Sequence, residues 1–361
     1  SQGALKTGGV PVSIKKHMQE LLSSDVTDYY QSAWGVSQLR KKLAEQLSQK
    51  HKISLSVKNV IITHGCIGAL TSLFFTILER GDDVLIPEPT YPAYKNLTKI
   101  CRCNPIMVPY IEENNPPYWN IDIEKIKAAA TDKTKILVFS NPCNPLGTIV
   151  PKEILIELKN WCEKKGIYLI VDESYDNFIF DDNDFDSATP MVAESDFVIR
   201  TGSFSKSLSM SGWRVGFMVL PESISTNTGI TQDALINCPN VFAQHGVLYA
   251  LNNPECSKHL HDSVLDARNT VVSSLDELRN KGYIEYHTPP ASFYLFIKTM
   301  SEDSFDLCTD ILNTVKVGLI PGRAFGESGK PFVRLCYART ESVIEEGTNR
   351  IINYFSKKTY V

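Results

Sequence analysis

The sequence predicts an α/β fold in which a larger domain holds a mostly parallel sheet and a smaller α+β domain is formed from both ends of the chain. Between residues 58 and about 220, short continuous apolar runs alternate with segments of helical apolar spacing. This pattern is typical of parallel strands that are covered by helices on both faces. The length of 361 residues also suits two domains rather than one or three.

Seven short runs rich in β-branched and other apolar residues are the predicted strands of the larger sheet. They comprise residues 60–63, 83–86, 105–108, 135–140, 167–171, 197–201 and 215–220. Helical segments lie between most of them, such as 67–78, 123–130 and 153–164. Asp122 and Pro151 stand directly before two of these segments, where such residues commonly begin helices.

From about residue 256 the pattern changes. A long helical segment ends near Gly282, a residue type that suits a helix C-cap. A βαβ-like set follows, with strands at 283–287, 293–297, 318–320 and 332–337 and helices at 305–315 and from 341. We expect the amino-terminal helices 13–22 and 38–49 to pack on this second unit. The predicted domains are therefore residues 45–260, which form the large one, and residues 1–44 with 261–361, which form the small one.

The composition excludes several classes of protein. Hydrophobic residues make up 43% and charged residues 22% of the chain, as in ordinary globular proteins. The net charge of −4 lacks the positive excess of nucleic-acid binders, so no nucleic-acid partner is expected. No apolar run is long enough for a bilayer, which predicts no membrane association. Nine scattered cysteines without metal-ligand spacing indicate reduced thiols, no metal site and a cytoplasmic location.

Polar side chains follow directly after several predicted strands of the larger sheet. Taken singly, each group has an ordinary structural interpretation, such as a rigid turn or a helix cap. Ligands of open parallel sheets bind beyond the carboxyl ends of the strands, so we expect these groups to share one edge. The segments are His64-Gly65-Cys66-Ile67, Asn141-Pro142-Cys143-Asn144-Pro145-Leu146-Gly147, Asp172-Glu173-Ser174-Tyr175 and Gly202-Ser203-Phe204-Ser205-Lys206, with Arg214 eight residues after the lysine.

Together these segments suit one particular cofactor. They supply a helix start that can bind an anion, an amide, a carboxylate with a phenol, two hydroxyls, a lysine and an arginine. A matching ligand carries a phosphate, a basic ring nitrogen, a phenolic oxygen and an aldehyde. Pyridoxal 5′-phosphate has all four, and its protein partners are a lysine for the aldehyde and a carboxylate for the ring nitrogen. The sequence therefore predicts a pyridoxal phosphate site.

The ordered motifs N-P-C-N-P-L-G, D-E-S-Y, S-F-S-K and S-G-W-R-V-G-F resemble those of the fold-type I, class I/II aminotransferases, which depend on pyridoxal phosphate. The resemblance extends from the segment Y-Q-S-A-W-G-V-S-Q-L-R at residues 30–40 to F-V-R-L-C-Y-A at residues 332–338. It implies an aspartate-aminotransferase-like fold and an enzyme that moves an amino group between an amino acid and a 2-oxo acid by ping-pong chemistry.

The resemblance also implies roles for individual residues around the cofactor. Lys206 should bind the aldehyde and later move the proton of the substrate, and Asp172 should pair with the ring nitrogen. Tyr175 and Asn144 should contact the phenolic oxygen, and Asn144 also the substrate. The phosphate should be held by the backbone of Gly65, Cys66 and Ile67 and by the side chains of Ser203, Ser205 and Arg214.

Three further positions complete the implied site. Tyr91 should stack on the cofactor ring, and Arg334 should grip the α-carboxylate of the substrate. Tyr30 should reach the phosphate of a partner subunit, which implies a homodimer with shared active sites.

The distribution of charge bears on the substrate. No lysine or arginine occurs between Arg214 and Lys258, whereas one dicarboxylate-specific branch of the family takes an arginine for the distal carboxylate from this region of the partner. A second carboxylate buried without a partner is costly. We therefore expect an L-amino acid with a neutral or aromatic side chain to be favoured.

Two other functions remain open at this point. A lyase or decarboxylase of the same fold uses the same cofactor and the same lysine, and nothing in the motifs excludes it. A non-catalytic regulator that binds pyridoxal phosphate is a more distant alternative, because such proteins carry a fused DNA-binding domain and no basic helix-turn-helix pattern flanks the α/β region.

Overall fold

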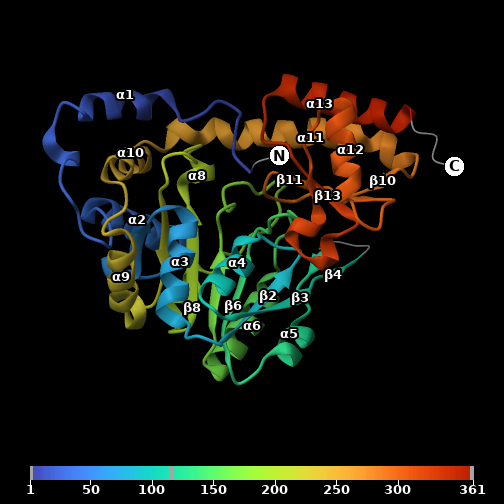
Figure 1. Cartoon of the computed structure of the whole chain (residues 1–361). Helices are drawn as coiled ribbons and strands as arrows, with labels where there is room; N and C mark the ends of the chain where they lie inside the picture. The colour runs from blue at the N-terminus through green and yellow to red at the C-terminus, as the bar shows by residue number, and fades with distance from the viewer. Residues whose placement is uncertain (1–2, 114–117, 358–361) are drawn as a thin grey trace.

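The computed structural model describes residues 3–113 and 118–357. Figure 1 shows a larger lobe around a central sheet and a smaller lobe that contains the carboxyl-terminal part of the chain. The larger sheet has seven strands in the order β1-β9-β8-β7-β6-β2-β3. Their bounds are β1 (Val60–Thr63), β2 (Asp83–Glu88), β3 (Asn104–Pro109), β6 (Thr134–Ser140), β7 (Tyr168–Asp172), β8 (Val198–Ser203) and β9 (Gly216–Val219). All seven predicted strands form, which confirms the predicted α/β class.

The larger sheet is mostly parallel, as predicted. Strand β9 runs antiparallel to both of its neighbours, β1 and β8, and the other pairs are parallel. In the register between β6, β7 and β8, Ser140 lies opposite Asp172 and Asp172 opposite Thr201. The carboxyl ends of these three strands therefore meet at one edge.

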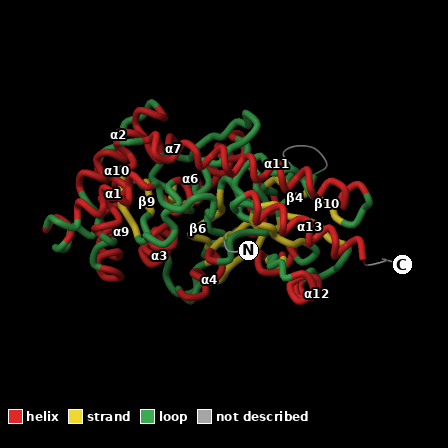
Figure 2. The backbone as a smooth tube through the Cα atoms, turned by 90° about the horizontal axis from the view of Figure 1, so that it is seen from above, coloured by secondary structure: helices red, strands yellow, loops and turns green. Residues whose placement is uncertain are grey.

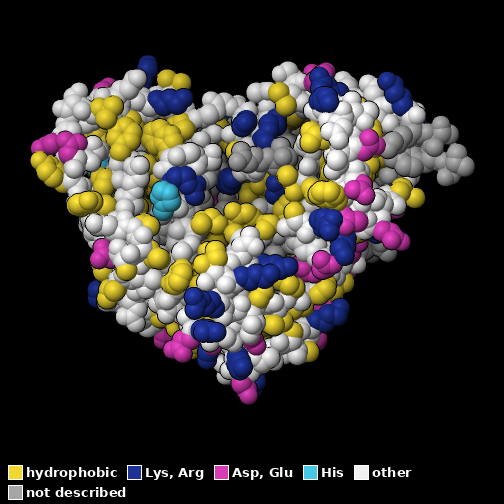
Figure 3. Space-filling model, viewed as in Figure 1, with side chains coloured by type: hydrophobic (Ala, Val, Ile, Leu, Met, Phe, Trp, Pro, Cys, Tyr) yellow, Lys and Arg dark blue, Asp and Glu magenta, His cyan; other side chains and the backbone are white. Residues whose placement is uncertain are grey.

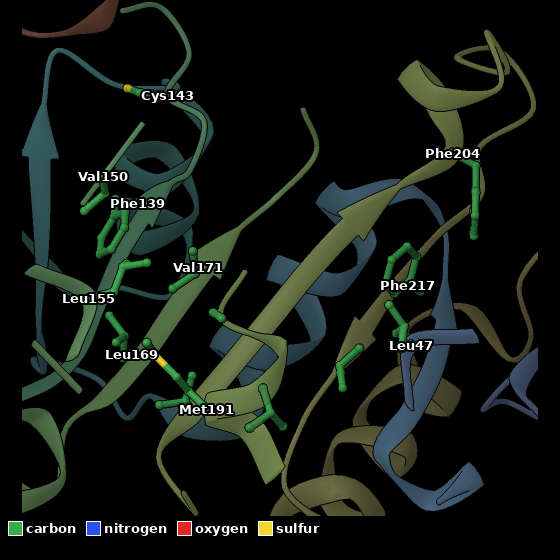
Figure 4. Packing of buried hydrophobic residues seen from close by; sticks show 14 of the residues in the cluster. Leu47, Phe139, Cys143, Val150, Leu155, Leu169, Val171, Met191, Phe204 and Phe217 are labelled. Carbon is green, nitrogen blue, oxygen red and sulfur yellow. The ribbon is translucent and has the colours of Figure 1, made fainter. Parts of the chain in front are cut away.

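Helices cover both faces of this sheet because alternate strand residues point to opposite sides. One face buries Ile86, Val138 and Ile170 with α3 and α4. The other buries Leu137, Leu169 and Val171 with α6 and α7, and Figure 4 shows Leu169 and Val171 close to Leu155 and Met191 of those helices. The helices of this lobe are α3 (Gly65–Ile77), α4 (Ala93–Ile100), α5 (Ile123–Ala129), α6 (Lys152–Lys165), α7 (Thr189–Glu194), α8 (Phe204–Ser207), α9 (Glu222–Ile236) and α10 (Val241–Asn252).

The smaller lobe contains a second sheet of four strands in the order β10-β11-β13-β12. Its elements are α11 (Lys258–Asn280), β10 (Ile284–Glu285), β11 (Tyr294–Thr299), α12 (Phe305–Val315), β12 (Ile320–Pro321), β13 (Phe332–Cys336) and α13 (Glu341–Lys357). Gly282 follows α11 with a φ of 73°, in agreement with the predicted helix end. This sheet has its own core of buried apolar residues, which includes Leu275 of α11 and Ile351 of α13.

The predicted βαβ arrangement of this second unit is wrong, because every pair of neighbouring strands is antiparallel. The order of strands and helices along the chain was read correctly, but that order alone does not fix strand direction. β13 inserts between β11 and β12, so the helix α12 connects two strands that are not neighbours.

The predicted packing of the two amino-terminal helices on the second sheet is also wrong. Helices α1 (Val12–Leu21) and α2 (Ser37–His51) both pack against α10 in the larger lobe, as Figures 1 and 2 show. The buried residues Ile14 and Met18 of α1 lie against Gly246 of α10, where a Cβ would collide with Trp213 and crowd the Met18 sulfur. The small residue thus allows a close approach of α1 that the hydrophobic pattern of α1 alone did not indicate.

The segment before α1 runs along the smaller lobe instead, where Lys6 and Arg339 form a parallel bridge. The domain limits of 45–260 for one unit and 1–44 with 261–361 for the other stay a prediction. Two further short strands, β4 (Ile111–Glu112) and β5 (Trp119–Asn120), pair with each other. The remaining helical turns are η1 (Asp25–Thr27), η2 (Val57–Asn59), η3 (Pro254–Ser257), η4 (Gly322–Phe325) and η5 (Glu327–Gly329). None of the described helices has the length and hydrophobicity that a membrane span requires.

Candidate active site

A cavity of about 670 Å³ lies where the carboxyl edge of the larger sheet faces the smaller sheet. It brings together all of the predicted site residues except Gly65 and Tyr30: Cys66, Ile67, Tyr91, Asn144, Asp172, Tyr175, Ser203, Ser205, Lys206, Arg214 and Arg334. Asn144, Asp172 and Ser203 follow or end the neighbouring strands β6, β7 and β8, so the parallel direction of these strands places them together. Arg334 comes from β13 of the second sheet.

The Asp172 carboxylate is held on both of its oxygens. Oδ1 accepts hydrogen bonds from the backbone N–H of Ser174 at 3.0 Å and from its hydroxyl at 2.6 Å. Oδ2 accepts one from the Tyr94 hydroxyl at 2.9 Å. Asp172 and Tyr94 are both buried. A buried charge needs such partners, and here they also fix the direction in which the carboxylate faces the cavity.

Lys206 lies in the short helix α8, and its side chain is partly buried in the cavity between the two lobes. Its Nζ donates to the carbonyl oxygen of Gly3 and lies 5.9 Å and 5.6 Å from the ring centres of Tyr175 and Phe293. Burial, together with the positive charges of Arg334 and Arg214, lowers the pKa of Lys206 to about 8. A much larger share of its amine is therefore neutral, and hence nucleophilic, than for an exposed lysine.

Arg214 and the start of α3 form one end of the cavity. The Arg214 guanidinium lies against the start of α3, and its Nη1 is 3.5 Å from the Ser205 hydroxyl. Gly65 begins this helix with a φ of 69°, and a Cβ at that position would lie 2.5 Å from the Arg214 guanidinium. Glycine is therefore required at position 65 both for the backbone conformation and for the arginine. Gly65 supports this end from behind although it does not line the cavity.

The opposite end is formed by Arg334 and its neighbours. Nη1 of Arg334 donates to Oδ1 of Asn144 at 2.8 Å, and Nδ2 of Asn144 lies 3.5 Å from the Tyr175 hydroxyl. The guanidinium carbon is 4.2 Å from the ring centre of Tyr294 and 4.7 Å from that of Phe325. The two rings hold the charged group between them in a fixed plane.

Of the two remaining predicted aromatic residues, Tyr91 and Tyr30, only Tyr91 lies at the cavity of this chain. Tyr91 lines the cavity and packs edge-on against Tyr94, with ring centres 5.8 Å apart. Tyr30 is 81% exposed and does not line the cavity of its own chain. This placement agrees with a role in another subunit but does not test it.

The residues of the cavity that the sequence did not single out include Tyr94, Tyr294, Phe325 and Gly3. Tyr94 stands one helical turn after Tyr91, a spacing that could have suggested a shared environment. Tyr294 and Phe325 come from the smaller lobe, and their approach depends on how the two sheets face each other. No local sequence signal indicates that.

The arrangement matches one known family. The model of the family "Aminotransferase class I and II" matches residues 1–351. The chain belongs to this family. The aminotransferase is 31% identical to the "Probable aspartate/prephenate aminotransferase" of Aquifex aeolicus and to the "Aspartate aminotransferase" of Pyrococcus horikoshii, in each case over 94% of this chain and 86% of the relative. The structure of an aromatic aminotransferase from Pyrococcus horikoshii OT3 superposes with a TM-score of 0.91 and 27% identity, covering 99% of this chain and 96% of the other.

This aminotransferase is thus a transaminase that depends on pyridoxal phosphate, as are the relatives it resembles. The residues of the cavity fit that group. Three cationic side chains, Lys206, Arg214 and Arg334, line it together with the carboxylate of Asp172. A phosphate near Arg214 and a substrate carboxylate near Arg334 would compensate the excess positive charge at its two ends.

The lowered pKa of Lys206 predicts how the protein without cofactor captures pyridoxal phosphate. The neutral amine is the reactive form, so the capture rate should rise about tenfold per pH unit below pH 8 and level off above it. Stopped-flow absorbance at a series of pH values measures this rate. A rate that keeps rising to a midpoint near the ordinary lysine value of about 10.4 would contradict the described environment of Lys206.

Proposed function

We propose that the enzyme transfers the amino group of an L-amino acid with a neutral or aromatic side chain to a 2-oxo acid, in two half-reactions of ping-pong type. The observation that carries this proposal is the distribution of charge around the cavity. Among the described lining residues the cations are Lys206, Arg214 and Arg334, and we assign these to the aldehyde, the phosphate and the α-carboxylate. No further cation of the cavity wall is left for a second substrate carboxylate.

The part of the wall near Arg334 is apolar. It consists of Ile320, Ala324 and Phe325, and Ile320 lies opposite Arg334 in the register of β12 and β13. A substrate held through its α-carboxylate by Arg334 would place its side chain close to this surface, where apolar groups are favoured. Residues 215–257, which contain no lysine or arginine, cannot supply a compensating charge from a second subunit.

We propose the following roles at the cofactor. Pyridoxal phosphate, when bound, supplies an aldehyde for the amino group and a ring that withdraws electrons from the α-carbon of the substrate. Asp172, fixed by Ser174 and Tyr94, would keep the ring nitrogen protonated by its negative charge. Tyr175 and Asn144 would donate hydrogen bonds to the phenolic oxygen, and Tyr91 would pack on the ring.

The phosphate would be held by Arg214, the hydroxyls of Ser203 and Ser205, and the backbone N–H groups of Gly65, Cys66 and Ile67. These six donors come from three places on the same edge of the sheet. They are the start of α3, the start of α8 and the loop before β9. The helix α3 points its amino terminus at this place, which favours an anion there.

Lys206 would act as the base of the reaction. Its Nζ would be the group that accepts and holds the proton of the substrate's α-carbon, from the position beside Tyr175 that it occupies in the cavity. Its lowered pKa allows this amine to accept a proton at neutral pH far more often than an exposed lysine could. Arg334 would hold the α-carboxylate with its guanidinium fork, already oriented by Asn144.

A panel of amino donors tests the proposed selectivity. Alanine and phenylalanine should react with a kcat/KM equal to or above that of aspartate. The second carboxylate of aspartate would be buried without a partner, at a cost of about 2 kcal/mol or more. Steady-state assays with one shared 2-oxo acid measure this. The variant Ile320→Lys, which places a cation beside Arg334, should raise the aspartate value relative to phenylalanine about tenfold. A wild-type value for aspartate far above that of every neutral donor would contradict the proposal.

We also propose a homodimer in which Tyr30 of one chain completes the phosphate site of the other. Hydrophobic side chains gather on the surface over α1 and the segment that follows it, as Figure 3 shows. In this segment Leu22, Tyr29 and Tyr30 are 67%, 68% and 81% exposed. Apolar surfaces of this kind mark association sites. A second copy of the chain, docked on this apolar surface, would bury these side chains.

Mixed dimers of two variants, each altered in a different residue of the proposed shared site, test whether Tyr30 acts across the subunits. Tyr30→Phe should weaken the binding of pyridoxal phosphate about tenfold, the value of one lost hydrogen bond, whereas Tyr29→Phe should leave it unchanged. Mixed dimers of a Tyr30→Phe chain with a Lys206→Ala chain should regain one site of wild-type affinity, because the second chain supplies the missing tyrosine. Titration of the cofactor into each sample measures the affinity. A mixture that binds as weakly as Tyr30→Phe alone would contradict the exchange of Tyr30 between subunits.

A cytoplasmic location is part of the same proposal. All nine cysteines are unpaired, and Cys143 and Cys162 are buried in the core of the larger lobe. Such use of cysteine is typical of reducing compartments.

A further inference from the structure

Tyr294 is the cavity residue whose environment the proposed roles leave unexplained. It begins β11 in the smaller lobe and is 1% exposed. Its hydroxyl lies 2.8 Å from the hydroxyl of Tyr175, which comes from the larger lobe. Its ring lies under the guanidinium of Arg334, 4.2 Å from the ring centre. One side chain thus contacts a proposed cofactor ligand and the proposed substrate ligand.

These contacts belong to a closed ring of four side chains that joins the two lobes. Tyr175 contacts Tyr294 through their hydroxyls, and Tyr294 contacts Arg334 through its ring. Arg334 donates to Asn144 at 2.8 Å, and Asn144 is in turn 3.5 Å from the Tyr175 hydroxyl. Asn144 and Tyr175 follow strands of the larger sheet, whereas Tyr294 and Arg334 lie on neighbouring strands of the smaller one. Displacement of any of the four would therefore move the others.

The number of hydrogen bonds that the Tyr175 oxygen can make indicates which of the two hydroxyls donates to the other. A phenolic hydroxyl has one proton to donate and accepts at most two hydrogen bonds. Nδ2 of Asn144 can only donate, so it fills one accepting place on Tyr175. If Tyr294 donates into the second place, the proton of Tyr175 is left to point at a ligand in the cavity. Burial raises the pKa of both tyrosines, so both hydroxyls keep their protons.

The surroundings of Tyr294 favour donation from the Tyr294 hydroxyl to the Tyr175 oxygen. Gly3 covers its hydroxyl so closely that any side chain at position 3 would collide with that oxygen. The positive charge of Arg334 over the ring makes the phenol a better donor, since it stabilises negative charge on the ring. A chain in which Tyr294 donates to Tyr175 also strengthens the donation by Tyr175, because hydrogen bonds in series polarise one another.

We propose that Tyr294 is a positioning residue with two separable functions: its hydroxyl directs the proton of Tyr175 toward the phenolic oxygen of the cofactor, and its ring holds the Arg334 guanidinium in place for the substrate carboxylate. This inference rests on the roles proposed above for Tyr175 and Arg334. It assigns Tyr294 no contact with the reacting atoms.

The two functions predict different consequences for two substitutions. Tyr294→Phe removes the hydroxyl and keeps the ring, so it disturbs Tyr175 alone. Tyr294→Met removes both the hydroxyl and the ring face and leaves a smaller apolar side chain, so it disturbs both Tyr175 and Arg334. Tyr337→Phe is the matched control, because Tyr337 is also 1% exposed, belongs to the same core and does not line the cavity.

Two readouts on the protein loaded with pyridoxal phosphate separate the functions without relying on turnover. The first is the midpoint of the pH titration of the bound cofactor's absorbance, which a hydrogen bond to the ionised phenolic oxygen keeps low. The second is the Kd of 3-phenylpropionate, a carboxylate that lacks an amino group and can occupy the Arg334 site without reacting. The titratable and charged groups that face Tyr175 and Tyr294 stay unchanged in all variants: Lys206, Asp172, Arg334, Tyr91 and Cys336.

Tyr294→Phe should raise the midpoint of the absorbance titration by about half a pH unit and change the Kd of 3-phenylpropionate less than about twofold. Tyr294→Met should raise the midpoint by the same amount and weaken 3-phenylpropionate about tenfold, on the order of one cation–π contact. Tyr337→Phe should change neither quantity.

Tyr175→Phe distinguishes failure of this inference from failure of the proposed site. If Tyr175→Phe raises the midpoint and Tyr294→Phe leaves it at the wild-type value, the role of the Tyr294 hydroxyl is refuted and that of Tyr175 stands. If neither substitution moves the midpoint, the role of Tyr175 is refuted as well. Equal Kd values of 3-phenylpropionate for Tyr294→Phe and Tyr294→Met would refute the role of the ring.

Discussion

The excess of positive charge in the cavity between the two sheets is the constraint on which the rest of the site depends. Lys206, Arg214 and Arg334 face the same space, together with the carboxylate of Asp172. Burial is the main reason that the pKa of Lys206 falls to about 8, and the positive charges of Arg334 and Arg214 act in the same direction. In the proposed roles, the charge excess favours a phosphate at one end and a carboxylate at the other, and the lowered pKa of Lys206 favours its action as nucleophile and base.

The fold meets this constraint by bringing two sheets face to face. The parallel sheet supplies Asn144, Asp172 and Ser203, the groups we assign to the cofactor, because the ends of β6, β7 and β8 lie side by side. The antiparallel sheet supplies Arg334 and the aromatic rings of Tyr294 and Phe325 around it. The hydrogen bond from Arg334 to Asn144 joins the two groups of residues, so the side chains that the two sheets contribute form one connected structure.

Those features that depend on local sequence could be predicted, and those that depend on packing could not. The larger sheet was predictable because continuous apolar runs between helices specify buried parallel strands. The cavity residues near the ends of β1, β6, β7 and β8 were predictable because polar segments follow these strands, whereas Tyr91 and Arg334 were indicated only by the family resemblance. The antiparallel second sheet was missed because strand order along the chain does not specify direction. The place of α1 was missed because it depends on Gly246 of a distant helix, and Tyr94 and Tyr294 were missed because their partners are far away in sequence.

The central claim is that this cavity performs amino transfer with Lys206 as its base. The most direct test is a single turnover in which phenylalanine alone is added to the protein loaded with pyridoxal phosphate. The account predicts one 2-oxo acid released per active site, conversion of the cofactor to pyridoxamine phosphate, no ammonia, and no conversion in Lys206→Ala. Release of ammonia with 2-oxo acid in excess over the sites, or full turnover by Lys206→Ala, would contradict it.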